Sequence, residues 1–260
     1  MERLLLAVAT ALLLAAVGFT VYLVGAGRDL PHRFNFWMLL GAFGGLSGFL
    51  WLRGQEIGRC PLTSLFEVMI FLGWATLLIY LIVGSSYRVS LMGAFAGPMA
   101  LLLLIVGLLA GERAANPSTA VLNPWIELHA ALSVIAYGAF GLACVGGVMY
   151  FLQDRMLKTR RILPIFYRLP PVNHLAKVND RLLLIGVALL ACGIGAGFAV
   201  GYLPDKGKML GAILVWLVYF AILLARWLHG LNPTRMALVS IYSFPVSMAI
   251  FLWIASNSVE

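Results

Sequence analysis

Eight stretches of the chain consist almost entirely of apolar residues, and short polar segments separate them. They lie at 4–25, 36–52, 64–83, 90–110, 125–152, 181–203, 210–228 and 236–256. A helix of about 17–25 apolar residues is long enough to cross the hydrocarbon core of a bilayer. Because backbone polar groups find no water there, each stretch is expected to be a helix that satisfies them internally. The pattern predicts an all-α, polytopic membrane protein with eight transmembrane helices.

The composition agrees with this pattern. Of the 260 residues, 62% are hydrophobic and only 11% are charged, whereas soluble domains have about 25% charged residues. We therefore expect one integral membrane domain over 1–260, in contact with the lipid bilayer. The first apolar stretch is longer than the core of a signal peptide, which is about 7–15 residues, and is expected to be retained as a helix.

Positive charge indicates the orientation of the helices. The segment 153–180 is the longest polar stretch and is rich in Lys and Arg, so it is expected to be a basic cytoplasmic loop. With eight helices, both termini then lie outside, and 12 of the 18 Lys and Arg residues lie inside. In a soluble chain the net charge of +8 would suggest nucleic acid. Here an anionic leaflet explains it better, and no nucleic-acid partner is expected.

The sequence contains no sign of soluble catalytic machinery. It has no Walker loop, GxGxxG, HExxH or nucleophile elbow, and its three cysteines share no CxxC spacing. A role other than catalysis is therefore favoured. The candidates that remain are ionisable groups inside the predicted spans, namely Glu67, Glu127 and His129. Such groups are costly in a bilayer and by default indicate a functional site.

These three groups are expected at one depth, just beneath the outer surface. Glu67 and His129 are three and four residues into their spans, or ~5 and ~6 Å at 1.5 Å per residue. Glu127 and His129 are two residues apart and point to nearly opposite sides of their helix, so only one can face the same cavity as Glu67.

Aromatic residues accompany these groups. Trp74 follows Glu67 by two helical turns, Tyr137 follows His129 by eight residues, and Trp125 lies at the mouth of the fifth helix. An imidazole beside aromatic faces is suited to axial ligation of a haem iron. A carboxylate hydrogen-bonded to the far ring nitrogen would fix its tautomer. The alternative is a structural polar pair that holds the third and fifth helices together.

Two of the predicted helices resemble segments of CcsA/ResC-type cytochrome c biogenesis proteins. The third helix has that family's Pro-Leu opening, its glutamate and a later Trp, and the fifth has Trp-x-x-x-His followed by Tyr. The helices at 181–203 and 210–228 resemble those that flank the family's tryptophan-rich loop, and the likeness covers about 50–256. The matching positions are Pro61, Leu62, Leu65, Glu67, Trp74, Trp125, His129 and Tyr137.

The resemblance implies a haem-handling protein that assists cytochrome c biogenesis. It implies that His129 matches an external ligand of the haem iron, and that Glu67, Trp74, Trp125 and Tyr137 surround the cofactor near the outer face. It also implies a CcsB/ResB-like membrane subunit as partner and a location in the bacterial inner membrane.

Some features depart from the family pattern. The loop "GYLPDKGK" contains no tryptophan, the family's intramembrane histidine falls on Leu224, and its second external histidine has no counterpart up to Glu260. These departures resemble the short, HemX-like branch, whose members are implicated in controlling the level of a haem-synthesis enzyme. A regulatory or scaffold protein that acts on haem biosynthesis without binding haem is therefore an alternative. A transporter that moves protons through Glu67 and His129 is a third, although no discontinuous repeat supports it.

Overall fold

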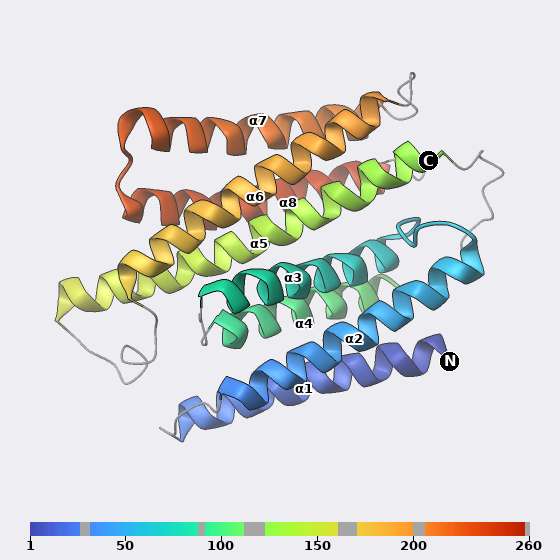
Figure 1. Cartoon of the computed structure of the whole chain (residues 1–260), viewed down its shortest axis with the longest axis horizontal. Coiled ribbons are helices and arrows are strands. Elements are labelled where there is room, and N and C mark those ends of the chain that lie inside the picture. The colour runs from blue at the N-terminus through green and yellow to red at the C-terminus, as the bar shows by residue number, and fades with distance from the viewer. Residues whose placement is uncertain (27–31, 88–91, 112–122, 161–170, 200–205, 258–260) are drawn as a thin grey trace. The chain divides into compact units, whose positions relative to one another are not determined.

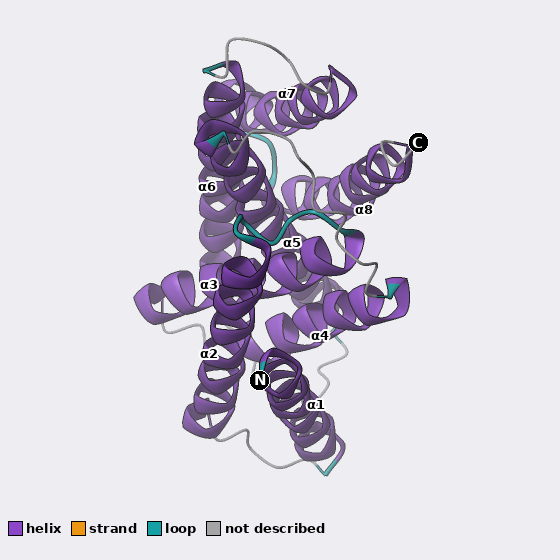
Figure 2. Cartoon of the chain, turned by 90° about the vertical axis from the view of Figure 1, so that its right-hand side faces the viewer, coloured by secondary structure: helices purple, strands orange, loops and turns teal. Residues whose placement is uncertain are grey.

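The computed structural model of the protein describes residues 1–26, 32–87, 92–111, 123–160, 171–199 and 206–257 (Figure 1). All regular structure in these ranges is helical (Figure 2). Each of the eight helices is long and apolar enough to cross a membrane. The prediction of an all-α, multi-pass membrane protein is confirmed, while the orientation with both termini outside stays a prediction. The helices are α1 (Glu2–Gly25), α2 (His32–Ile57), α3 (Leu65–Tyr87), α4 (Met92–Ala110), α5 (Pro124–Thr159), α6 (Val172–Phe198), α7 (Lys206–His229) and α8 (Pro233–Asn257).

The helices form two compact units, each with its own internal contacts. In unit 1, α1 packs along α2, α3 packs along α4, and α1 also contacts α4 (Figure 1). In unit 2, α5 has its most extensive contact with α6 and also packs on α8, while α7 contacts α6 and α8. A single membrane domain over 1–260 stays a prediction.

Helix ends are where the structure departs most from the predicted spans. The second span was expected at 36–52, but α2 extends from His32 to Ile57. The sixth was expected from 181, but α6 begins at Val172, directly after Pro171. Its first turns bury Leu175 to 1% exposure even though most of their residues are polar. A search for apolar runs cannot detect such amphipathic ends.

The basic segment 153–180, expected to be a loop between two spans, is helical at both ends in the described residues. Its beginning continues α5 to Thr159, and its last residues form the first turns of α6. In the described part of this segment, Lys158 pairs with Asp154 one turn earlier, at 2.6 Å. Residues 161–170 lie outside the described residues. The cytoplasmic location of the segment stays a prediction.

Small residues allow close helix contacts in both units. In unit 1, a Cβ at Gly45 of α2 would lie 3.0 Å from the Cβ of Ala9 in α1. In unit 2, the ring of Phe140 occupies the space that a side chain at Gly186 would take, with only 2.3 Å to a Cβ placed there. Phe140 also stacks on Tyr219, with ring centroids 3.7 Å apart. Glycines at these helix interfaces therefore serve close packing.

A proline inside α8 explains another contact in unit 2. Pro245 has no N–H, so the carbonyl group of Ile241, four residues earlier, loses its helical partner. The Cys144 thiol of α5 donates a weak hydrogen bond to that carbonyl oxygen, with a sulfur–oxygen distance of 3.8 Å. Cys144 is thus a packing residue that also satisfies a backbone acceptor.

Candidate functional site

The histidine of the fifth helix makes a defined hydrogen bond inside unit 2. His129 lies in the second turn of α5, and its Nδ1 is 2.8 Å from the carbonyl oxygen of Gly193 in α6. A carbonyl oxygen can only accept a hydrogen bond, so Nδ1 carries the proton and donates it. In the neutral ring this leaves Nε2 with a free lone pair. The contact therefore selects the tautomer in which Nε2 can bind a metal.

Two glycines bring α6 close enough for this bond. A Cβ at Gly193 would lie 3.1 Å from the Oγ of Ser133 and 3.4 Å from the backbone oxygen of His129. A Cβ at Gly197 would lie 3.1 Å from Nδ1 of His129. A side chain at either position would crowd Ser133 or His129. Gly193 and Gly197, which are four residues apart in the sequence, therefore leave the space in which the imidazole lies, while Gly201, the next glycine at this spacing, lies outside the described residues.

The beginning of α5 is defined by its cap. The side-chain oxygen of Asn123 accepts a hydrogen bond from the backbone N–H of Trp125 at 3.0 Å, and Pro124 occupies the first helical position. The Trp125 side chain is 48% exposed. Because Trp125 precedes His129 by four residues, both lie on the same face of α5. An exposed aromatic side chain thus lies next to a half-buried imidazole.

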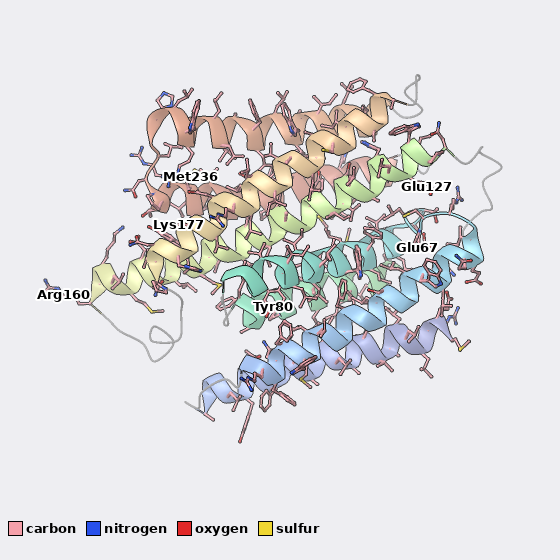
Figure 3. The ribbon with its side chains drawn as sticks, in the orientation of Figure 1. Glu67, Tyr80, Glu127, Arg160, Lys177 and Met236 are labelled. Atoms are coloured by element: carbon pink, nitrogen blue, oxygen red, sulfur yellow. The ribbon has the colours of Figure 1, made fainter. Side chains whose placement is uncertain are left out.

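Glu127 lies in the first turn of α5, where the helix dipole favours a negative charge. Figure 3 labels it at one end of α5, with Arg160 at the other. Its Oε1 is buried and has no hydrogen-bond partner among the described residues. The sequence led us to expect a carboxylate at the far nitrogen of His129. The structure instead places the Gly193 carbonyl group there.

Tyr137 lies deeper in unit 2 than the histidine. Its side chain is 6% exposed, and its ring packs against Phe251 and Phe140 with centroid distances of 5.3 and 6.3 Å. Eight residues separate it from His129 along α5, or ~12 Å of helix. In this structure Tyr137 belongs to the aromatic core of unit 2, and a role beside a cofactor stays a prediction.

Glu67 belongs to unit 1, where both of its carboxylate oxygens are engaged. It lies in the first turn of α3 and is fully buried. Oε1 accepts a hydrogen bond from Nε of Arg53 in α2 at 3.0 Å. Oε2 accepts from the backbone N–H and the hydroxyl of Thr63, at 2.9 and 2.7 Å. The backbone N–H of Glu67 donates to Ser64 Oγ at 3.3 Å, so the start of α3 is a variant of the capping box.

Arg53 is a partner of Glu67 that was not expected from the sequence. Its side chain is 9% exposed, and besides Glu67 it contacts Glu56 at 3.4 Å and Glu2 at 3.6 Å. One guanidinium therefore links α1, α2 and the start of α3, where Figure 3 labels Glu67. Two features of the sequence could have indicated this pair. One is a carboxylate inside a predicted span, and the other is an arginine at the end of the preceding span. The contact of Glu67 with the fifth helix stays a prediction, because Glu67 and His129 fall in different units.

Trp74 is also held inside unit 1. Its indole N–H donates to the hydroxyl of Ser47 in α2 at 2.8 Å, and its ring stacks on Phe43 with centroids 5.6 Å apart. Phe71 lies on another side of the ring at 5.1 Å. These contacts account for a tryptophan at this position, and its role at a cofactor stays a prediction.

Metal binding by side chains alone receives no support from the described part of the chain. No three His, Cys, Asp or Glu residues lie together there in a way that would hold an ion. A haem iron has a smaller requirement, because the porphyrin supplies four nitrogens and the protein supplies the axial ligands. His129 fits that requirement, since Gly193 occupies Nδ1 and Nε2 stays available.

Comparison with known proteins places the chain in a family. The model of a family described as "Cytochrome C assembly protein" matches residues 62–259. The chain belongs to the cytochrome C assembly protein family. All five candidate residues, Glu67, Trp74, Trp125, His129 and Tyr137, fall inside the matched range, whereas Arg53 lies outside it.

The chain is also similar to individual proteins, among them a HemX and a CcsA protein. Protein HemX of Brevibacillus brevis is 27% identical over 180 residues, which is 69% of this chain and 66% of that protein. An uncharacterized 28.8 kDa protein of Azospirillum brasilense is 40% identical over 88 residues, 34% of this chain and 32% of that protein. Cytochrome c biogenesis protein CcsA of Chlorella vulgaris is 23% identical over 272 residues, 84% of this chain and 86% of that protein. The chain thus spans just under two thirds of the first relative and a third of the second.

The comparisons confirm the resemblance to the CcsA and HemX proteins found in the sequence.

Proposed function

We propose that this cytochrome C assembly family member handles haem during cytochrome c biogenesis and binds the haem iron through His129. The hydrogen bond between His129 Nδ1 and the Gly193 carbonyl oxygen carries the proposal, because it leaves Nε2 as a free metal-binding nitrogen. Membership of the family and the similarity to CcsA proteins support a role in cytochrome c biogenesis.

In this proposal, Gly193 and Trp125 assist His129 in binding haem. Gly193 orients the imidazole and raises the basicity of Nε2 through the hydrogen bond to Nδ1. Trp125 offers an exposed aromatic face to a flat apolar ligand. When bound, haem would be the group that is later attached to a cytochrome. The chain holds and orients this group and is an assembly factor rather than an enzyme.

The proposed location is based on the charge distribution along the sequence. The Lys and Arg bias supports a position of the start of α5, and therefore of His129, near the outer face of the membrane. Similar proteins occur in the bacteria Brevibacillus brevis and Azospirillum brasilense, which supports the bacterial inner membrane. A CcsB/ResB-like membrane subunit is the proposed partner, since the loop "GYLPDKGK" has no tryptophan where the family has its tryptophan-rich segment.

The test is an absorption spectrum of the detergent-purified protein after incubation with haemin. We expect a Soret band in the wild type and its loss or shift in His129→Ala. His229→Ala is the matched control, because His229 is an exposed histidine in the last turn of α7. A wild-type protein without any Soret band, or a band that His129→Ala leaves unchanged, would contradict the proposal.

A second candidate function rests on the similarity to protein HemX of Brevibacillus brevis. The chain would then act on haem biosynthesis as a regulatory or scaffold protein that binds no haem. Deletion would change the level of haem precursors while cytochrome c maturation stayed normal. The opposite result would favour the role in assembly.

A further inference from the structure

We infer that the cavity between α7 and α8 binds a lipid-soluble carbonyl compound of the quinone type, whose oxygen accepts a hydrogen bond from Tyr219. The cavity has a volume of about 220 Å³, and all the residues that line it belong to unit 2. They come from α7 and α8, whereas His129 belongs to α5. The inference therefore goes beyond the proposed function and does not depend on it.

The cavity arises where short side chains of two neighbouring helices face each other (Figure 1). α7 contributes Val215, and α8 contributes Ser243 and Ser247. One side of the cavity is open, because Tyr242 and Val246 in its lining are 69% and 59% exposed. Sites that enclose a drug-sized molecule measure about 300–1,000 Å³. This cavity therefore takes one ring or a short segment, while the rest of the ligand lies in the bilayer.

The hydroxyl group of Tyr219 is the hydrogen-bond donor of this cavity. Tyr219 lines the cavity and is 1% exposed. Ser247 uses its single hydroxyl hydrogen to donate to the carbonyl oxygen of Phe244 at 2.9 Å. In the contact between Tyr219 and Ser247, Tyr219 is therefore the donor. The distance between the two oxygens is 3.4 Å, which is longer than the usual range of about 2.5–3.0 Å. An acceptor oxygen of a ligand can thus replace Ser247 at little cost.

The surroundings prepare Tyr219 for this role. Its ring stacks on Phe140, with centroids 3.7 Å apart and an angle of 2° between the planes. Only the hydroxyl hydrogen has to rotate when a ligand enters, so little conformational freedom is lost on binding. The neighbouring hydroxyl of Ser243 already donates to the carbonyl oxygen of Val239 at 2.7 Å. Tyr219 is therefore better placed than Ser243 to donate to a ligand.

The depth of the cavity distinguishes its ligand from a phospholipid. Tyr219 precedes His229, the last residue of α7, by 10 residues, or ~15 Å. This is about half the thickness of a hydrocarbon core of ~30 Å. The ester carbonyl groups of phospholipids lie in the interfacial layers, so acyl chains bring no acceptor to this depth. A quinone carries carbonyl oxygens on a flat apolar ring and dissolves in hydrocarbon, so it meets both requirements.

The experiment measures binding of decyl-substituted benzoquinone to the full chain in nanodiscs of ether-linked phosphatidylcholine, with empty nanodiscs as the baseline. Decylbenzene, which has the same chain and no carbonyl group, is the matched probe. We expect the wild type to bind the quinone more tightly than decylbenzene. Tyr219→Phe should weaken quinone binding by about 2–12-fold, the effect of losing one neutral hydrogen bond, and should leave decylbenzene binding unchanged. Tyr150→Phe is the control, because Tyr150 is a buried tyrosine of α5 outside the lining of this cavity.

Two further variants separate binding from folding. Ser247→Ala removes the acceptor that competes for the Tyr219 hydroxyl, so it should bind the quinone more tightly than the wild type does. Ser243→Phe places a ring in the cavity and should abolish binding of both probes. Opposite effects of Tyr219→Phe and Ser247→Ala cannot result from a loss of folded protein.

Three results would overturn the inference. The wild type could bind no quinone, it could bind quinone and decylbenzene equally, or Tyr219→Phe could bind the quinone as tightly as the wild type does. In the last two cases the cavity is a contact site for hydrocarbon chains alone. None of these results affects haem binding by His129, which the Soret band of His129→Ala tests separately.

Discussion

Replacing Arg53 with alanine is expected to lower the free energy of unfolding by about 3–5 kcal/mol, the loss that follows when one partner of a buried ion pair is removed. Glu67 is fully buried, and its Oε1 accepts from Arg53 at 3.0 Å. Without the guanidinium, the carboxylate is left without its countercharge in an apolar unit. Thermal or SDS-induced unfolding of the detergent-purified variant measures the loss.

The double variant Arg53→Met/Glu67→Leu tests the cause of this loss. It replaces both charged groups with apolar side chains of similar size, so no unpaired charge remains, and it is expected to be more stable than Arg53→Ala alone. A double variant as unstable as the single one would show that packing of the arginine stem, rather than the charge, is responsible.

An exposed ion pair provides the matched control. Lys158 is 64% exposed and contacts Asp154 at 2.6 Å. Exposed pairs contribute about 0–1 kcal/mol, so Lys158→Ala should leave unfolding nearly unchanged. If Arg53→Ala lowered the free energy of unfolding no more than Lys158→Ala does, the stabilising role of the buried ion pair would be contradicted.

Replacing Gly147 with alanine is expected to lower the free energy of unfolding by about 1–3 kcal/mol, the usual cost of overpacking a core. A Cβ at this position would lie 2.8 Å from the backbone oxygen of Ala237 in α8 and 3.3 Å from Ile241 Cγ1. A backbone oxygen cannot rotate away as a side chain can, so α5 and α8 would have to separate. Thermal or SDS-induced unfolding of the detergent-purified variant measures this loss as well.

The neighbouring glycine is the control for this change. A Cβ at Gly146 would meet only the Asn179 side-chain oxygen, at 3.9 Å, which is an ordinary contact. Since alanine is favoured over glycine in a helix by up to about 1 kcal/mol, Gly146→Ala should be neutral or slightly stabilising. Equal stability of the Gly146→Ala and Gly147→Ala variants would refute the close approach of α5 and α8.

The polar ends of the helices could not be predicted from apolar runs. The first turns of α6 and the last turns of α5 are rich in charged residues, and their helical state depends on a few buried positions such as Leu175 and Gln153. Outside the hydrocarbon region a helix needs only one apolar face. Sequence composition therefore located the spans but not their ends.

The candidate residues were found from the sequence because ionisable groups are rare in apolar spans. Their partners were not. Gly193 acts through its backbone carbonyl oxygen, which has no signature in a sequence and which can accept from His129 because a carbonyl oxygen has two lone pairs.

The sequence by itself determined that this is a multi-pass membrane protein of the cytochrome C assembly family, with eight membrane-length helices in the described part of the chain, because apolar runs and short motifs are local properties of the chain. Only the tertiary structure decided that Glu67 pairs with Arg53 and that His129 donates to Gly193. Fourteen residues separate the first pair and 64 the second. Which groups meet over such separations depends on how the helices pack, and here helix packing depends on where glycine allows two backbones to approach.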